Sequence, residues 1–251
     1  MPPVPDEAIC IRQWDWSETS QTALLFSRGH GLLRVLAKGS RRPKHPFSGG
    51  LEILSRGRIG VIVRPQSELA LLTEWDLAET FPALRSSLRI HNAGLFIADV
   101  INHTIHDHDP HPALYDTTVE CLRLMLTPDD VAPAMLKFLW SVLVETGYRP
   151  VLDADVRTGE EIVGAPAYRF APALGGLTSD DSGPETPHSW RIRHETVGLL
   201  RALDTTGLAA GIGADPGAID RAARLLASYL RHILGAEPPT MSLVFGQRLA
   251  R

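Results

Sequence analysis

The sequence is poor in cysteine. Its 251 residues include only two, Cys10 and Cys121, which lie far apart, each inside an apolar run. Such a pair is typical of buried free thiols in a reducing compartment and cannot make a disulfide framework. The sequence therefore excludes the class of small secreted domains that disulfides hold together.

Long hydrophobic runs and a targeting segment are also missing. The most apolar stretches, residues 95–105 and 135–144, are much shorter than the roughly 20 residues that cross a bilayer. Residues 1–7 hold three prolines and two acids, where a secretory signal has a basic segment followed by an apolar one. We therefore expect a cytoplasmic protein.

Charge is unevenly distributed along the chain. Residues 1–64 contain ten Lys and Arg against five acids, a net charge of +5. The remaining residues contain 15 basic and 24 acidic residues, a net charge of −9. A basic first quarter on an acidic body predicts a polyanion-binding site confined to one domain, although a chance imbalance at the surface is the alternative.

The first quarter of the chain has the pattern of short strands separated by turns. The expected strands cover residues 8–14, 21–27, 31–37, 51–63 and 69–75. A basic loop with two prolines, residues 41–46, follows the third of them. Five short strands within fewer than about eighty residues predict a small closed barrel.

From Thr80 onward the pattern becomes helical. Apolar residues at helical spacing predict helices over residues 85–103, from Pro112, over 128–147, over 190–203 and over 216–234, the last with Asp215 as its N-cap. Residues 149–189 show no clear periodicity, so we expect them to form an irregular subdomain or loop.

Several motifs resemble the RecO family. That family characteristically reads Gly-Glu-Ser/Thr-Ser, then Thr/Ser-Arg-Glu-His-Gly, then Ala-Lys-Gly-Ala-Arg-Arg-Pro. This chain has Ser17-Glu18-Thr19-Ser20, Ser27-Arg28-Gly29-His30-Gly31 and Ala37-Lys38-Gly39-Ser40-Arg41-Arg42-Pro43. Gly29 stands where an acid is usual, and Ser40 where alanine is usual. Further matches follow in the same order at residues 71–77, 81–85, 147–150 and 170–176.

The resemblance implies an α+β fold with two domains. Residues 1–78 would form an N-terminal OB-fold β-barrel, and residues 79–251 an all-α helical domain. Within the latter, the irregular insert 149–189 would replace a segment that resembles a zinc ribbon. Many relatives carry four zinc cysteines there, but residues 153–159 and 178–181 contain no thiol. Because structural zinc needs four Cys or His ligands, we expect no metal and no cofactor.

The resemblance also implies a function without catalysis. RecO-like proteins mediate recombinational DNA repair: they bind single-stranded DNA, anneal complementary strands, and help load recombinase onto strands coated with single-strand-binding protein. The implied partners are single-stranded DNA, RecR through the N-terminal domain, and the acidic C-terminal tail of single-strand-binding protein through the helical domain. The expected location is the nucleoid in the cytoplasm.

Basic residues of the barrel are the candidates for DNA contact. The predicted nucleic-acid-binding residues are Arg34, Lys38, Arg41, Arg42, Lys44, Arg56 and Arg58. Trp14 and Trp16 could stack on bases, or could instead close the barrel from inside. The candidates for binding the acidic tail are Arg201, Arg221, Arg224 and Arg231.

Two alternative functions come from other classes. Residues 103–111 contain His103, His106, His108 and His111, which could bind a metal in a hydrolase; the other interpretation is a polar loop after a helix. The third hypothesis is a module that only binds proteins, through apolar helix faces such as Leu136, Leu139 and Leu143. At helical spacing such faces are more often core.

Overall fold

The computed structural model describes residues 2–42, 47, 51–63, 67–162, 167–179, 189–206 and 214–246. The chain divides into two compact units. The first comprises Met1–Pro128 and Pro238–Val244, and the second comprises Asp129–Glu237 and Phe245–Arg251. The predicted boundary at residues 78 and 79 lies within the first unit, at the end of the last barrel strand, so this unit contains the barrel together with the first helices.

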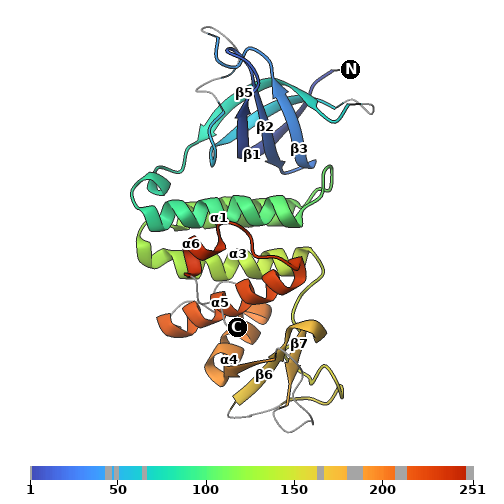
Figure 1. Ribbon diagram of the computed structural model, residues 1–251, viewed down its shortest axis with the longest axis vertical. Coiled ribbons are helices and arrows are strands. Elements are labelled where there is room, and N and C mark those ends of the chain that lie inside the picture. Colours follow the sequence, from blue (N-terminus) through green and yellow to red (C-terminus); the bar gives the residue numbers. More distant parts are fainter. Residues whose placement is uncertain are drawn as a thin grey trace. The chain divides into compact units, whose positions relative to one another are not determined.

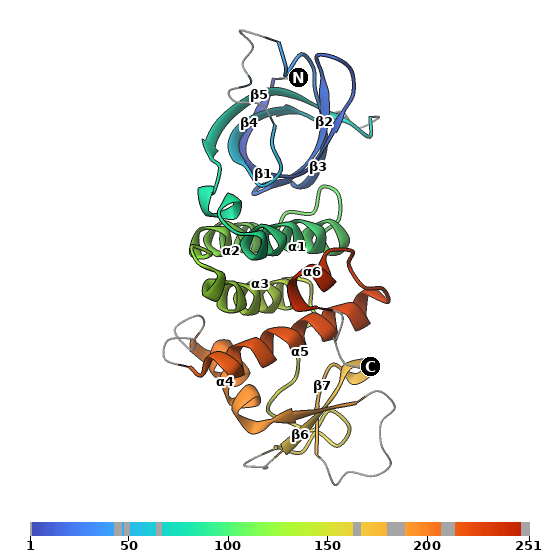
Figure 2. The ribbon, with the colours of Figure 1, turned by 60° about the vertical axis from the view of Figure 1, so that its left-hand side comes forward.

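The N-terminal strands form a closed barrel, as predicted. They are β1 (Val4–Asp15), β2 (Gln21–Ser27), β3 (Gly31–Ala37), β4 (Arg56–Ile62) and β5 (Ala70–Glu79). Their order around the barrel is β1-β2-β3-β5-β4, and Figure 2 shows the ring that they make. The long β1 pairs with both β2 and β4, while β3 and β5 close the ring in parallel. This arrangement is OB-like and confirms the fold class.

The barrel core follows from the alternation of side chains along the strands. Residues such as Leu25, Val35 and Val61 point inward and are buried. Trp75 on β5 is 0% exposed and fills the interior beside β4. A Cβ atom at Gly57 would lie 2.8 Å from the Trp75 ring, so only glycine fits there. The residue that closes the barrel from inside is thus Trp75.

Two helices complete the main part of the first unit. A short 3₁₀ turn, η1 (Pro82–Arg85), leads into α1 (Leu88–Thr104), and α2 (Pro112–Leu124) follows. The side chain of Ser87 caps α1 by accepting a hydrogen bond from the Arg89 backbone N–H at 3.2 Å. Both helices were predicted, with ends within a few residues of those observed.

Ion pairs and hydrogen bonds connect the barrel with α1, α2 and the loop between them. They are Arg12 with Asp99, Arg28 with Asp116, Arg34 with Asp107, Arg56 with Tyr115, and Arg123 with Glu79. Phe26 adds an aromatic contact with Tyr115, at 5.7 Å between ring centroids. Polar contacts therefore hold much of the barrel against these helices.

The second unit combines helices with a small sheet. Its elements are α3 (Val131–Glu145), β6 (Ala167–Ala171), η3 (Pro172–Leu174), β7 (Gly176–Thr178), β8 (Trp190–Arg193), α4 (His194–Thr206) and α5 (Pro216–Leu234). The 3₁₀ turn η2 (Pro128–Asp130) precedes α3. The last described helix, α6 (Met241–Phe245), belongs to the first unit except for Phe245 (Figure 1). Asp215 caps α5 as predicted, accepting from the Ala218 N–H at 2.9 Å.

The predicted helix over residues 190–203 begins later than expected. Trp190–Arg193 form β8, which pairs with β6, and the helix starts at His194. Trp190 stacks on Phe170 with ring centroids 5.9 Å apart. Pairing with a strand remote in sequence overrides the local helical pattern here.

The segment 149–189 is more regular than predicted. Its described residues include β6 and β7, which form a three-stranded sheet with β8 in the order β7-β6-β8. Apart from that sheet, the regular elements described after the barrel are helices, and residues 147–162 form turns with isolated bridges. No helix in the described part of the chain is both long and apolar enough to cross a membrane.

Candidate nucleic-acid interface

The seven basic residues predicted to bind DNA fall into two groups. Three of them, Arg34, Arg56 and Arg58, are engaged by carboxylates. Arg34 Nε donates to Asp107 Oδ2 at 3.0 Å, and Arg58 pairs with Asp76. Arg56 is held more completely, because its Nη2 lies 2.7 Å from Glu7 Oε2 and its Nη1 lies 3.5 Å from Glu79 Oε2. Because carboxylates partly neutralise their charge, these three side chains attract a phosphate less strongly.

The Arg56 cluster is also partly removed from water. The Arg56 side chain is 19% exposed, and its Nε donates to the Tyr115 hydroxyl at 3.3 Å. Burial raises the pKa of Tyr115 to about 12, so the phenol stays protonated at neutral pH. This cluster is a contact between barrel and helix, within the first unit.

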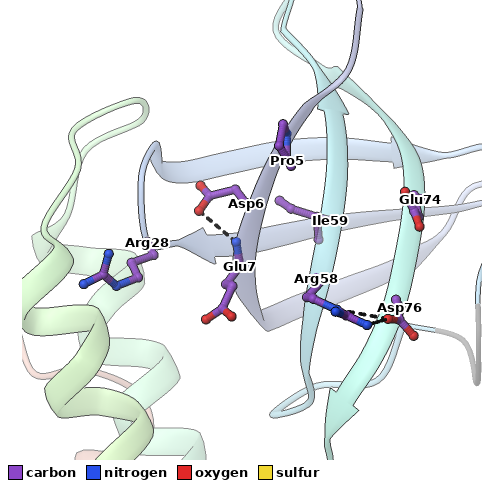
Figure 3. A pocket seen from close by; sticks show the side chains of 8 residues that line it. All are labelled: Pro5, Asp6, Glu7, Arg28, Arg58, Ile59, Glu74 and Asp76. Atoms are coloured by element: carbon purple, nitrogen blue, oxygen red, sulfur yellow. Dashed lines mark hydrogen bonds and ion pairs between the residues drawn. The ribbon is translucent and has the colours of Figure 1, made fainter.

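A hollow of about 810 Å³ lies on the barrel beside Arg58 (Figure 3). Its lining consists of Pro5, Asp6, Glu7, Arg28, Arg58, Ile59, Glu74 and Asp76. Four carboxylates against two guanidinium groups make the hollow acidic. An acidic surface repels a phosphate backbone, so we do not place DNA there.

Three of the other predicted residues, Lys38, Arg41 and Arg42, lie at a second place, which we call the barrel rim: residues 14–20 and 38–42. Two turns meet there, one after β1 and one after β3. The Arg41 N–H donates to the Thr19 carbonyl at 3.1 Å, and the Gly39 N–H donates to Ser20 Oγ at 3.0 Å. Ser40 Oγ donates to Gln21 Oε1 at 3.1 Å. These hydrogen bonds fix the two turns side by side.

Local sequence explains the second turn. Gly39 has φ of 71°, a left-handed conformation that favours glycine. Ser40, which replaces the alanine usual in the RecO motif, is buried and provides one of the hydrogen bonds between the turns. The turn thus presents its basic side chains from a fixed backbone.

Two cations of the rim are available to a ligand. Lys38 and Arg42 are exposed, and neither forms an ion pair with any residue that the structure describes. Arg41 is also exposed but pairs with Asp15. Lys44 lies outside the described residues. The structure therefore brings Lys38, Arg41 and Arg42 together and separates them from Arg56 and Arg58.

Trp14 and Trp16 belong to the same rim. Their exposed fractions are 50% and 62%, so neither fills the barrel. Of the two interpretations that the sequence left open, burial as a barrel-closing residue is wrong for both.

The four arginines predicted to bind an acidic tail all have partners in the second unit. Arg201 donates to the carbonyl oxygens of Leu152 and Ile162, each at 2.9 Å, and its guanidinium lies over the Tyr168 ring. The other three pair with carboxylates: Arg221 with Asp215, Arg224 with Asp220, and Arg231 with Glu237. Tail binding by these residues stays a prediction.

The histidines of residues 103–111 do not converge. Among the residues that the structure describes, no group of three or more His, Cys, Asp or Glu side chains could hold a metal ion. His103 Nδ1 lies 2.7 Å from the Asp99 carbonyl oxygen, and His111 Nε2 lies 3.3 Å from Asp109 Oδ2. Such contacts fit the polar loop that the sequence offered as the other interpretation.

The carboxylate partners are the feature that sequence reasoning missed. Asp107 is 73 residues from Arg34, and Glu7 is 49 residues from Arg56. No local pattern marks such pairs, because the register of the barrel and its contact with the helices create them.

Comparison with known proteins identifies the family. Residues 1–81 match the family model described as Recombination protein O N terminal, and residues 85–242 match Recombination protein O C terminal. The chain is 32% identical over 197 residues to a DNA repair protein RecO of Rhodopirellula baltica, which covers 78% of this chain and 73% of that protein. It is 30% identical over 232 residues to a DNA repair protein RecO of Anaeromyxobacter dehalogenans, covering 90% of each.

These two matches to the family models cover nearly the whole described chain, and their division falls between the barrel and α1. The relatives extend over both compact units. The chain therefore belongs to the RecO family of DNA repair proteins.

Proposed function

We propose that the protein is a recombination mediator that binds single-stranded DNA at the barrel rim, anneals complementary strands, and helps load recombinase onto strands coated with single-strand-binding protein. It does so without catalysing a reaction, within the nucleoid. The observation that carries the proposal is the rim itself, where Lys38 and Arg42 are exposed beside two exposed tryptophans. A basic surface next to aromatic rings suits a polyanion that carries bases.

Binding at the rim is expected to depend on the phosphate backbone rather than on base sequence. The cations lie on a turn, and none of them belongs to a helix that could enter a groove. Phosphate contacts of this kind release counterions, so affinity should fall as salt rises. Annealing requires the same indifference to sequence, because any two complementary strands must be held.

We also propose the partners that the family implies. RecR would contact the N-terminal domain, and the acidic tail of single-strand-binding protein would contact the helical domain near Arg201, Arg221, Arg224 and Arg231. Each of these arginines is already paired with an acidic side chain. An acidic tail would therefore have to replace those partners.

Fluorescence anisotropy of a labelled single-stranded oligonucleotide, measured at several salt concentrations, tests the DNA site. The variant is Lys38→Ala with Arg42→Ala. We expect weaker binding at low salt and a slope of log affinity against log salt that is shallower by roughly 0.7 for each lost phosphate contact. Annealing of complementary strands should slow in parallel.

The matched control is Arg89→Ala with Arg193→Ala, which removes two exposed arginines outside the rim. It has the same net charge as the test variant and should keep most of the affinity and the salt slope. An equal loss in both variants would show that only total charge matters, and normal binding by the rim variant would remove the rim from the DNA site.

A further inference from the structure

We infer that Trp14 and Trp16 stack on unpaired bases and thereby make the barrel rim select single-stranded over double-stranded DNA. The inference depends on the proposed DNA site, and it assigns to that site its specificity-determining residues. Lys38 and Arg42 attract any phosphate backbone, paired or unpaired. A second feature is needed to distinguish the two forms.

The exposure of the two rings is the first observation. Trp75 of the same barrel is 0% exposed, whereas Trp14 and Trp16 leave 50% and 62% of their surface in water. Large aromatic rings are usually buried, and two of them exposed within three residues form a patch that marks a binding surface. Neither ring is needed to fill the barrel.

The register of the strands places Trp14 on the outer face of the barrel. Trp14 pairs with Thr22 of β2, and Thr22 pairs with Leu36 of β3. The neighbouring row, which contains Ala23 and Val35, points into the core. Because side chains alternate between the two faces, the row of Trp14 points outward.

Lys38 lies near the same outward-facing row. Strands β1 and β3 run in the same direction, because each is antiparallel to β2. Lys38 follows Leu36 by two residues, and Trp16 follows Trp14 by two residues, so Lys38 and Trp16 lie beyond the same end of their strands. The strands β1 and β3 are separated only by β2, which corresponds to about 10 Å. A charge for the phosphate and rings for the bases thus lie at the same end of two strands that are separated only by β2.

The rim is also held rigidly. The Trp16 N–H donates to the Ser20 carbonyl at 3.0 Å, and the Arg41 N–H ties the other turn to Thr19 at 3.1 Å. A rim fixed in this way loses little conformational freedom when a ligand binds. Its rings can stack on bases only where these are not paired and stacked within a duplex, whereas its cations meet phosphate in either form.

The occupant is therefore nucleic acid with accessible bases. A protein partner with an apolar surface would also cover the rings, but it would have no use for the adjacent Lys38 and Arg42 unless it were acidic. The experiment below separates the two, because its ligands contain no protein.

The test uses the full chain and three ligands of equal length: a single-stranded oligonucleotide, an abasic strand with the same backbone, and a duplex. The variants are Trp14→Ala with Trp16→Ala, and Trp14→Phe with Trp16→Phe. Tyr148→Ala is the control, because Tyr148 is 49% exposed and lies in the second unit. Anisotropy gives each affinity over a range of salt.

The alanine variant lacks both rings, and we expect each lost ring to weaken single-strand binding by at least about 5-fold. The slope of log affinity against log salt should not change. The affinity of this variant for the abasic strand and for the duplex should stay that of the native protein. The phenylalanine variant should restore much of the loss, and Tyr148→Ala should change nothing.

Two other results would overturn the inference, and they differ. If the native protein binds the single strand in a salt-dependent way but prefers it neither to the abasic strand nor to the duplex, the rim binds DNA without stacking. If the native protein binds no strand at low salt, the proposed function fails together with the inference.

Discussion

At the scale of the residue, Asp6 holds the turn between β2 and β3. Its carboxylate accepts hydrogen bonds from the backbone N–H groups of Glu7 and Gly29, at 2.7 Å and 3.0 Å, and from the Ser27 hydroxyl. His30 Nδ1 lies 2.8 Å from the same carboxylate. An acidic residue at position 29, usual in the RecO motif, would bring a second negative charge against Asp6, which explains why glycine suits this chain.

The titration of Asp6 gives a prediction. Burial on its own raises the pKa of Asp6, but the hydrogen bonds from Ser27, His30, Glu7 and Gly29 together outweigh burial and lower the pKa below 3.8. A group whose pKa is lower in the folded state stabilises the protein at pH values above its pKa in the unfolded state. That stabilisation is lost as the pH falls through the pKa of the folded state. Asp6→Asn should therefore reduce the free energy of unfolding by about 1–3 kcal/mol at pH near 7.

Urea denaturation checks this prediction at neutral pH and again well below 3.8, the ordinary pKa of an aspartate. The difference between native protein and Asp6→Asn should shrink at the lower pH, where the native carboxylate also gains a proton. Asp15→Asn is the control, because Asp15 is 68% exposed and its pair with Arg41 is worth less than about 1 kcal/mol. A difference that persists unchanged at low pH would contradict the argument.

At the scale of the element, Asp155 fastens the loop after α3 to the end of β7. The carboxylate is 2% exposed and accepts from the Ser179 N–H at 2.7 Å, from Ser179 Oγ at 2.9 Å and from the Arg157 N–H at 2.8 Å. Asp155 and Ser179 stand in the two stretches, residues 153–159 and 178–181, where the resemblance to the RecO family led us to look for zinc cysteines. A hydrogen-bonded carboxylate connects these two stretches here.

Replacing Asp155 tests that connection. Asp155→Ala removes the buried acceptor of the Ser179 and Arg157 donors, which are only partly buried, and should lower the free energy of unfolding of the second unit by about 1–2 kcal/mol. Asp153→Ala is the control, since Asp153 is 78% exposed, and it should cost less than about 1 kcal/mol. A metal chelator should leave the melting temperature of the native protein unchanged; a clear drop would indicate a structural metal.

At the scale of the whole molecule, Asp99 connects three distant parts of the first unit. Its side chain is 5% exposed and pairs with Arg12 of β1 at 3.0 Å. Its other oxygen accepts from the Thr240 N–H at 3.1 Å and from Thr240 Oγ1 at 2.8 Å. The barrel, α1 and the segment Pro238–Val244 thus meet at one buried carboxylate.

Loss of Asp99 should have two effects. Asp99→Ala should lower the free energy of unfolding by about 1–3 kcal/mol, because the Thr240 donors lose a buried acceptor, while the Arg12 side chain is 40% exposed and can still be hydrated. The segment around Thr240 should also become more sensitive to protease. Asp116→Ala is the control: Asp116 is 56% exposed, and loss of its exposed pair with Arg28 should leave the free energy of unfolding nearly unchanged. Equal losses in the two variants would show that burial at Asp99 is unimportant.

Charge shows how sequence and tertiary structure differ. Along the chain, residues 1–64 carry a net charge of +5. In the folded protein, Arg12, Arg28, Arg34 and Arg56 pair with acids that follow residue 75. Among the described residues, Lys38 and Arg42 have no such acidic partner. The positive charge that is not neutralised therefore lies mainly at these two residues. The DNA-binding role of these residues, and the domain boundary at residue 78, stay predictions.

By itself the sequence determined the barrel strands, most of the helices and the family. Strands β2 and β3 and helix α5 have the predicted bounds, because alternation, helical periodicity and the Asp215 cap are local signals. Tertiary structure alone decided that Trp190 is in a strand, that Trp14 and Trp16 are exposed, and which arginines keep their charge available. Each of these depends on contacts between residues far apart in the chain, and only the folded arrangement creates them.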